Sequence, residues 1–450
     1  MGLRSWLSQR SACGRAPAPN GLGYVTQWYA PEPFHTPEWT VRALAARGWD
    51  VTVLTGVPNY PDGVVQPGYS ARRLSREVLG GQTVIRAPLF PSHDRSALRR
   101  TLNYVSWAVS ASVVGARMLR RSAVNYVYSS PATAALPALV ARVLGRRPYV
   151  LSVQDVWPDS VFASGFLTEG PLRRVAEGFL SWFVGLTYRW AHHVVVISPG
   201  MRALLHDRGV PADKISLVYN WVDETVFKPS EPDPAFRQRL GLEPGDFAVV
   251  YAGNHGAAQG LRTAIEAVTS LPPDLRVHLV LIGDGVEKEA LRAYAVRLGA
   301  ERIHFVGSMP THQIPATTAS CEIQLVSLVD DPLFKLTMPS KVQAIMAMGQ
   351  PVLASAPGDA ARLVQESGAG FAVAPSSPSA LAESISRASR LTRAELRRMG
   401  DNGRRRYLEQ MSADVGSAAL DQILQAAVSV SGHPQRRASP PACAPTDVRR

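Results

Sequence analysis

The chain has 450 residues, of which 46% are hydrophobic and 19% charged, and this balance excludes an intrinsically disordered protein. At roughly 150 residues a domain, it is long enough for two or three domains. Its three cysteines, Cys13, Cys321 and Cys443, lie far apart, which excludes a disulfide framework and a spaced metal site and fits a reducing, cytoplasmic compartment. The formal net charge of +12 fits nucleic acid, an anionic membrane surface or an anionic substrate.

The first half alternates short apolar strands with helical stretches, which predicts a parallel sheet with crossover helices. We expect residues 1–20 to be a disordered extension, because they contain no apolar run long enough for a signal peptide. A Rossmann-like domain then spans 21–228. Its expected strands are 22–28, 51–55, 84–87, 125–128, 149–153, 194–197 and 215–218, and its expected helices are 38–47, 98–121, 133–144, 172–192 and 200–207.

A segment rich in proline and acidic residues follows, and we expect a linker over 229–244. The pattern restarts in a second Rossmann-like domain, 245–428, and residues 429–450 are expected to be a disordered tail. Its expected strands are 248–251, 277–282, 303–306, 323–326, 352–353 and 370–373. Its expected helices are 261–271, 287–298, 312–319, 340–348, 360–366, 378–391, 396–410 and 415–427.

The predicted fold class is therefore α/β, with two doubly wound domains facing a central cleft. Ligands of open α/β sheets bind beyond the carboxyl ends of the strands, so polar residues that follow strands are site candidates. In the first domain these are Glu32, His35, Asn59, Tyr60, Gln154, Asp155 and Trp157. Ordinary turn chemistry, helix capping or a loop position without a role are the alternatives for each of them.

In the second domain, three glycine-rich turns follow strands: "AGNHGAAQG", "GDG" and "VG". Glycine lets a backbone approach a ligand closely, although the spacing is not the G-x-G-x-x-G dinucleotide fingerprint and each turn alone could be ordinary. The candidate donor-binding residues here are Gly253, Asn254, His255, Gly256, Gln259, Gly260, Gly283, Asp284, Gly285, Val306 and Gly307.

The stretch "KLTMPSKVQAIMAMGQPVLAS" places lysines at the head of a short apolar helix. We expect Ser340 to cap this helix, with Gln343 completing a capping box. Lys341 and Lys335 would then stand beside free backbone N–H groups at a positive helix end, where two phosphates could bind. The alternative is that both lysines are solvated. Met338 and Pro339 belong to the same candidate edge.

Two stretches, 98–121 and 179–190, combine aromatic side chains with arginines. That composition suits an interfacial surface meeting an anionic membrane, and packing onto the first sheet is the alternative. No stretch reaches the ~18 clean apolar residues of a transmembrane helix. Nucleic-acid binding is disfavoured, because no helix-turn-helix, zinc or aromatic β-platform pattern accompanies the positive charge.

Together these stretches resemble the family 4 retaining glycosyltransferases of the GT-B fold, and especially the N-acetyl-L-fucosamine transferases of O-antigen and exopolysaccharide assembly. The similar stretches are "YVTQWYAPE", "ALAARGWDVTVLTGVPNYPDG", "SVQDVWPDS", "YAGNHGAAQGL", "LIGDG", "FVG" and "KLTMPSKVQAIMAMGQPVLAS". They run from about residue 24 to 370, which is nearly the whole globular part.

The resemblance implies a nucleotide-sugar donor, expected to be a UDP-sugar, in the second domain and an acceptor in the first. The acceptor would be a saccharide or a polyprenyl-linked glycan, the enzyme would need no metal or other cofactor, and it would lie in the cytoplasm or at the inner face of the cell membrane. Lys335, Lys341, Asp155 and His35 are the expected catalytic residues, and Glu32, Asn59, Tyr60 and Trp157 the expected acceptor contacts.

The chain departs from the wider family at several positions. Leu336 and Ala344 stand where that family usually has two glutamates, the second of which holds the donor ribose; Gln343 and Glu322 are candidate replacements. Asn254 and Gln259 replace an arginine and a lysine. Phe34 and His35 replace a glycine pair, and Gln154 replaces a histidine. A sugar-nucleotide epimerase of the same fold, or a degenerate protein that only binds nucleotide or lipid, are the rival functions.

Overall fold

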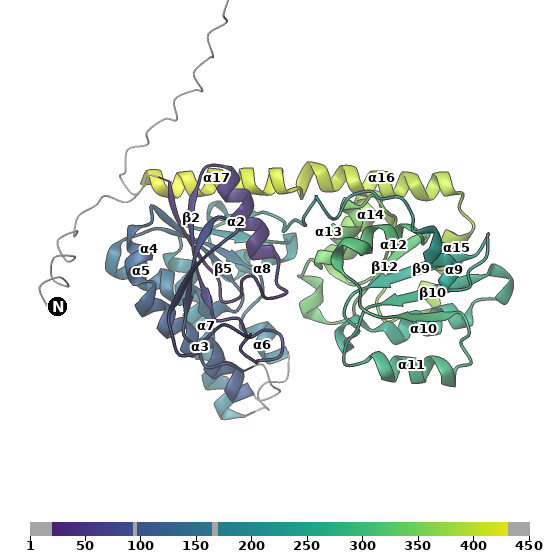
Figure 1. The fold of residues 1–450 in the computed structure, drawn as a ribbon, viewed down its shortest axis with the longest axis horizontal. Coiled ribbons are helices and arrows are strands. Elements are labelled where there is room, and N and C mark those ends of the chain that lie inside the picture. Colours follow the sequence, from purple (N-terminus) through teal and green to yellow (C-terminus); the bar gives the residue numbers. More distant parts are fainter. Residues whose placement is uncertain (1–19, 93–96, 164–169, 431–450) are drawn as a thin grey trace, which may run out of the picture.

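The computed structural model describes residues 20–92, 97–163 and 170–430. The expected disordered ends, 1–20 and 429–450, lie almost wholly outside these residues. The described chain forms two α/β units, one built on an eight-stranded sheet and the other on a six-stranded sheet (Figure 1). The prediction of two doubly wound domains is confirmed.

The first sheet has the strand order β3-β4-β2-β1-β5-β6-β7-β8. All neighbours are parallel except β3 and β4. Every residue of β1, β5 and β6 is buried, as expected for a sheet covered by helices on both faces. The strands are β1 (Gly21–Val25), β2 (Asp50–Gly56), β3 (Ser75–Leu79), β4 (Gln82–Ala87), β5 (Val124–Ser129), β6 (Tyr149–Val153), β7 (His193–Val196) and β8 (Ile215–Leu217).

Strand β3 was not predicted. It forms a hairpin with β4 through Gly80 and Gly81, both of which have positive φ angles (56° and 81°). Two glycines between alternating residues are a hairpin signal, because both central positions of such a turn favour residues that tolerate positive φ. The signal was present in "EVLGGQTV".

The helices of the first unit are α2 (Thr36–Ala46), α3 (Ala97–Val114), α4 (Ala116–Arg121), α5 (Leu136–Gly145), α6 (Asp159–Ala163), α7 (Pro171–Trp190) and α8 (Pro199–Asp207). The predicted single helix 98–121 is broken at Gly115. A Cβ at Gly115 would lie 2.3 Å from Leu54 Cδ2, so only glycine allows this close approach to β2.

The second sheet is entirely parallel, with the order β11-β10-β9-β12-β13-β14. Its strands are β9 (Phe247–Ala252), β10 (Val277–Ile282), β11 (Ile303–Val306), β12 (Ile323–Ser327), β13 (Val352–Ser355) and β14 (Gly370–Val373). Its helices are α9 (Pro234–Arg239), α10 (Leu261–Ser270), α11 (Lys288–Arg297), α12 (Ile314–Ala319), α13 (Ser340–Ala347), α14 (Gly358–Ser367), α15 (Pro378–Ser389) and α16 (Arg393–Gln410).

The segment expected to be a linker, 229–244, contains helix α9. Phe236 and Leu242 are buried in an apolar cluster with residues of β9 and β10. Arg237 binds the carboxylate of Glu322, with Arg237 Nη1 3.0 Å from Glu322 Oε1. Most of this segment is therefore packed onto the second sheet.

The last helix, α17 (Ala413–Val430), returns to the first unit, as the yellow ribbon along one side of Figure 1 shows. Its Leu420 and Leu424 are buried in the core cluster of β1 and α2. Trp49 Nε1 donates to Asp421 Oδ1 at 2.8 Å. The expected second domain, 245–428, thus ends in a helix that packs on the first sheet, because the apolar face of α17 finds its partners there.

The carboxyl edges of the two sheets meet. Ser198 follows β7 and its hydroxyl donates to the carbonyl of Leu336, which follows β12. The N–H of Gly200, in the first turn of α8, donates to Asp359 Oδ2 at 2.5 Å, and Asp359 follows β13. Since both contacts come from residues just beyond strand ends, the arrangement agrees with the predicted orientation of the two edges.

Candidate functional site

The two glycine-rich turns after β9 and β10 are packed directly on one another. A Cβ at Gly283 would lie 2.1 Å from the carbonyl oxygen of Gly253, and the φ angles are +132° at Gly283 and +145° at Gly253. The N–H of His255 donates to the carbonyl oxygen of Asp284 at 2.7 Å. Both conformation and space therefore require glycine, and the turns form one rigid edge.

Lys341 projects from the first turn of α13 onto this edge. Its Nζ lies 3.3 Å from the centroid of the Tyr251 ring. A Cβ at Gly253 would lie 2.9 Å from the same Nζ. Among the described residues, Lys341 has no ion pair and no side-chain hydrogen bond. Loss of solvent lowers the pKa of Lys341 well below its ordinary value of 10.5. The amine of Lys341 therefore lies over an aromatic face without an acidic partner in the described chain, and its charged form is disfavoured until an anion binds.

His255 is the second unusual group at this edge. Its side chain is fully buried, and neither ring nitrogen has a hydrogen-bond partner of normal geometry within the described chain. Desolvation and then Lys288 lower its pKa, whereas the backbone of Ile282 and Asp284 raise it. The rings of His255 and Tyr251 lie 6.0 Å apart, so the imidazole borders the Lys341 position.

The N-terminus of α13 differs from its prediction. The N-cap residue is Pro339, no side chain caps the helix, and Ser340 is exposed. The predicted capping box is therefore wrong. Gln343 is buried, and its Nε2 has no hydrogen-bond partner in the described chain. The N–H of Val342 donates to the Pro339 carbonyl at 3.0 Å, so the N–H groups of Ser340 and Lys341 are the uncapped donors at this helix end.

Lys335 lies in a different environment. It ends a 3-10 turn, Pro332–Lys335, and its exposed ammonium is 3.8 Å from Asp330 Oδ1. Its backbone packs under Gly358, where a Cβ would be 2.0 Å from the Lys335 carbonyl oxygen. Lys341 lies against an aromatic ring whereas Lys335 is exposed, so the two lysines are not equivalent.

In the first unit, the side chains of Glu32 and Asn59 form hydrogen bonds within the protein. The buried Glu32 carboxylate accepts N–H groups of Tyr29, Asn59 and Tyr60 at 3.1, 2.9 and 2.9 Å. Burial raises the pKa of Glu32, and these three hydrogen bonds oppose the shift. The Asn59 amide donates to the Val57 carbonyl and accepts from Asn103. Both residues join loops of the site, and their polar atoms already have partners.

Asp155 follows β6 and accepts a hydrogen bond from the Ser130 hydroxyl at 2.6 Å. Desolvation raises its pKa, and the hydrogen bond from Ser130 lowers it. Tyr104, on α3, was not predicted to belong to the site. Its ring lies 6.2 Å from both Trp28 and Trp157, and Trp28 lies 5.5 Å from Tyr60. These aromatic rings form a wall beside Asp155.

The other two predicted residues of the first unit are His35 and Gln154. His35 is exposed, stacks on Trp39 at 5.8 Å and is the N-cap residue of α2. Gln154 donates to the Ser152 hydroxyl and accepts from the Asn220 amide, each at 2.8 Å.

The remaining donor-side residues frame the turns. Gln259 accepts from the Gly256 N–H at 3.1 Å, and Gly260 has a φ of +55°. Asp284 is exposed, accepts the Gly285 N–H and pairs with Lys288, and these contacts lower its pKa. The Val306 carbonyl accepts from the Gly283 N–H, and Gly307 is exposed.

Glu322 cannot replace the family's ribose-binding glutamate. It precedes β12, at the opposite edge of the sheet, and its carboxylate accepts the Ala248 N–H at 2.6 Å besides binding Arg237. Its partners show that it anchors α9.

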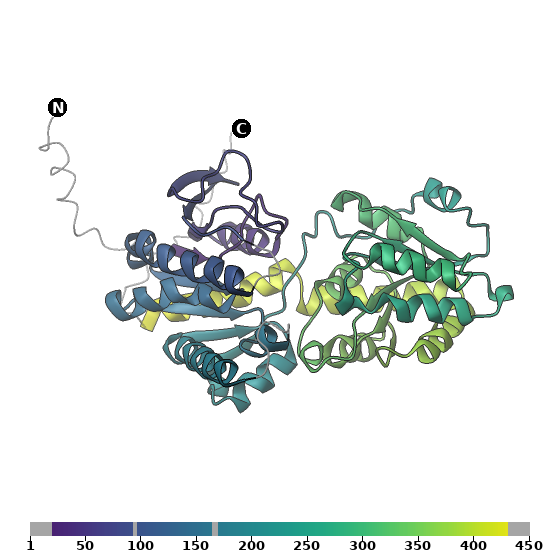
Figure 2. The same cartoon turned by 90° about the horizontal axis from the view of Figure 1, so that it is seen from below.

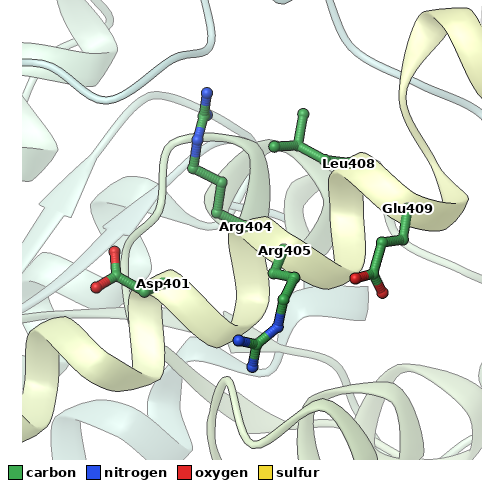
Figure 3. A pocket seen from close by; sticks show the side chains of 5 residues that line it. All are labelled: Asp401, Arg404, Arg405, Leu408 and Glu409. Carbon is green, nitrogen blue, oxygen red and sulfur yellow. The ribbon is translucent and has the colours of Figure 1, made fainter.

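A pocket of about 410 Å³ opens on α16, away from these strand edges. Figure 3 shows that Arg404 and Arg405 point away from each other, so their charges do not converge on one ligand. The described residues that line it are Asp401, Arg404, Arg405, Leu408 and Glu409. Within the described ranges there is no group of three or more metal-ligating side chains, and no helix is both long and apolar enough to cross a bilayer.

Comparison with known proteins identifies the family. Residues 36–221 match the model of a glycosyl transferase 4-like domain, and residues 232–406 match that of the glycosyl transferases group 1. The putative colanic acid biosynthesis glycosyl transferase WcaI of Escherichia coli K12 is 30% identical over 328 residues, covering 71% of this chain and 79% of that protein. The chain belongs to the family 4 glycosyltransferases.

Other relatives agree with this assignment. The probable glycosyltransferase WbjE of Pseudomonas aeruginosa is 26% identical over 299 residues, covering 66% of this chain and 74% of that protein. Crystal structures of Anabaena HepE in complex with UDP and with UDP-glucose share the fold at a TM-score of 0.64. They are 18% and 19% identical, and they cover 90% of this chain and 100% and 99% of HepE. The fold is therefore GT-B, as the sequence predicted.

Proposed function

We propose that this glycosyltransferase moves a sugar from a UDP-sugar to a saccharide or polyprenyl-linked acceptor, with retention of anomeric configuration, in the synthesis of a surface polysaccharide. The name of WcaI supports the pathway, and the UDP and UDP-glucose complexes of HepE support the donor. An N-acetylamino sugar of the fucosamine type stays a prediction from the sequence resemblance.

One observation carries the proposal: the desolvated ammonium of Lys341 faces the glycine turns without a counter-ion in the described chain. A departing diphosphate would supply that counter-ion. The free N–H groups at the start of α13 and the turns at Gly253–Gly260 and Gly283–Gly285 would add backbone donors. Met338, Pro339, Ser340 and Gln343 would complete this donor side, with Lys335 as a second, more exposed charge.

The chemical step follows from these placements. The acceptor hydroxyl oxygen bonds to the anomeric carbon while the bond from that carbon to the diphosphate oxygen breaks. The hydroxyl proton passes to the departing phosphate, on the same face of the sugar. Lys341 and the backbone donors stabilise the negative charge that develops on the leaving group, so the step as proposed needs no metal.

On the acceptor side, Asp155 and the aromatic wall of Tyr60, Tyr104 and Trp157 would orient the acceptor. Asp155 would hold a hydroxyl group, because Ser130 occupies only one of its two oxygens. His35, exposed at the start of α2, would contact the sugar at the rim. A polyprenyl-linked acceptor is embedded in a membrane, so we place the enzyme at its inner, cytoplasmic face.

A donor screen tests the proposal. The full chain is incubated with a panel of UDP-sugars and other nucleotide sugars, and release of the nucleotide is measured with and without saccharide acceptors. We expect release from a UDP-sugar that rises when an acceptor is added. A product formed from donor alone and carrying an epimerised sugar would instead identify an epimerase. Binding without turnover of any donor would identify a protein that only holds nucleotide.

A further inference from the structure

Two helices of the first unit expose matching apolar stripes. On α3 the stripe consists of Leu98, Leu102, Val105, Val109 and Val113, all of which are exposed. On α7 the residues at the same spacing are Val175, Phe179, Trp182, Leu186 and Trp190, and all but the half-buried Leu186 are exposed. Steps of three and four residues keep each stripe on one side of its helix over roughly 22 Å.

The opposite sides of these helices already have partners. Trp107 of α3 is fully buried in the first core cluster, as is Val184 of α7. Phe179 and Trp182, whose rings lie 5.7 Å apart, expose 65% and 59% of their surface. Large aromatic side chains at such exposure are not needed to cover the sheet, so packing onto the first sheet does not explain the stripes.

The charge around the stripes is predominantly positive. Helix α5 contacts both α3 and α7, and α4 contacts α3 and α5, so the four helices form one surface (Figures 1 and 2). Among their residues, Glu177 is the one acidic side chain. The arginines are Arg99, Arg100, Arg117, Arg120, Arg121, Arg142, Arg173, Arg174 and Arg189.

The geometry points to a membrane-docking face made by the outer stripes of α3 and α7, with an anionic lipid bilayer as its occupant. Apolar and aromatic side chains on a helix lying in the interface enter the acyl boundary, and arginines bind anionic head groups. The inner side of α3 carries Tyr104, which belongs to the aromatic wall beside Asp155. Docking through α3 therefore brings the bilayer to the helix that lines the acceptor site. This inference rests on the proposed polyprenyl-linked acceptor.

Vesicle flotation tests the docking face. The full chain is mixed with vesicles of phosphatidylcholine alone or with phosphatidylglycerol added, at low and at high salt. We expect binding to the anionic vesicles that weakens at high salt. The combined variant Leu102→Gln, Val105→Gln, Phe179→Gln and Trp182→Gln should lower the partition coefficient by ~10-fold or more. The control, Val286→Gln with Val296→Gln, removes two apolar residues of the second unit that are even more exposed, and it should bind like the wild type.

Three outcomes would overturn the docking proposal: wild-type chain that does not bind anionic vesicles, a stripe variant that binds as well as wild type, or a wild-type dimer that the stripe substitutions convert to monomer. In the last case the face would belong to a second copy of the chain. Nucleotide release with a water-soluble acceptor is measured in parallel and should be unchanged in the stripe variant. If the wild-type chain released nucleotide but did not bind vesicles, only the docking proposal would be rejected. If it bound vesicles but transferred no sugar, only the proposed function would be rejected.

Discussion

The polar residues at the two facing carboxyl edges differ in whether their side chains have hydrogen-bond partners. On the first sheet, Glu32 and Asn59 have their polar atoms occupied by backbone groups and by Asn103. On the second sheet, both ring nitrogens of the buried His255 lack hydrogen-bond partners of normal geometry in the described chain, and the amine of Lys341 lies over the Tyr251 ring without an ion pair there.

We infer that the first group of side chains stabilises the loops of the site and that the second group binds a ligand. A buried polar group with its hydrogen bonds made stabilises the fold, whereas an unpaired one costs free energy unless a ligand completes it. Asp155 lies between these cases, since Ser130 pairs with one of its oxygens. Substitutions on the two edges should therefore affect different measured quantities.

The largest effect is expected at Lys341. Lys341→Met keeps most of the side chain's length and removes its charge, so one charge-assisted contact to the leaving group is lost. We expect kcat/KM to fall by roughly 10- to 150-fold, the equivalent of ~1.5–3 kcal/mol. Steady-state nucleotide release measures it.

Lys214→Met is the matched control for this substitution. Lys214 also has a pKa lowered first by desolvation, but it precedes β8 at the amino edge of the first sheet. Its kcat/KM should stay within about twofold of wild type, because no leaving group contacts it. Equal losses in both variants would mean that the Lys341 position has no special role.

Asp155→Asn should impair use of the acceptor without changing binding of the donor nucleotide. The amide cannot hold the acceptor hydroxyl as the carboxylate does, so we expect transfer to the acceptor to fall about 10- to 100-fold. Calorimetric affinity for UDP should be unchanged. Asp159→Asn, which removes an exposed partner of Arg208 at the start of α6, is the control. A trapped covalent bond between Asp155 and the sugar would disprove the proposed same-face displacement.

Glu32→Gln should affect stability rather than chemistry. Its carboxylate accepts three backbone N–H groups, and the amide has only one oxygen to accept them. We expect the free energy of unfolding to drop by about 1–3 kcal/mol in denaturant titrations. Glu38→Gln, on α2, should change it little. If the variant kept its full stability but no longer transferred sugar to the acceptor, Glu32 would be an acceptor contact, as the sequence predicted.

The smallest expected effect is the uptake of a fraction of a proton when UDP binds. Burial lowers the pKa of Lys341 in the free enzyme, and a bound diphosphate should raise it by favouring the charged form. Between the lowered pKa and the ordinary value of 10.5, UDP binding should therefore take up protons. Calorimetry in two buffers of different ionisation enthalpy measures this uptake. Uptake that persists in Lys341→Met would assign it to another group, such as His255.

The sequence predicted the strands of both sheets, apart from β3, because buried parallel strands read as short apolar runs between turn residues. It also brought the glycine turns and Lys341 to one edge, since all of them follow strands. It could not show that Tyr104 reaches the carboxyl edge of the first sheet, because the residue lies in the middle of a helix and its contacts with Trp28 and Trp157 are tertiary.

The remaining errors share a cause. Helix α17 packs on the first sheet and α9 on the second because of apolar partners far away in the chain, and sequence order placed both differently. Glu322 was considered as a replacement for a family glutamate and Glu32 as a polar residue that follows a strand, yet their carboxylates bind Arg237 and backbone N–H groups. Local pattern identifies which residues can bind a ligand, and only the contacts show which of them are free to do so.

The most direct test of the account is a crystal structure of the chain with UDP bound. We predict that a diphosphate oxygen lies about 3 Å from Lys341 Nζ and accepts hydrogen bonds from the N–H groups at the start of α13. The account would be contradicted if the diphosphate bound elsewhere while Lys341 kept its position over the Tyr251 ring, with no phosphate oxygen within about 4 Å of its ammonium.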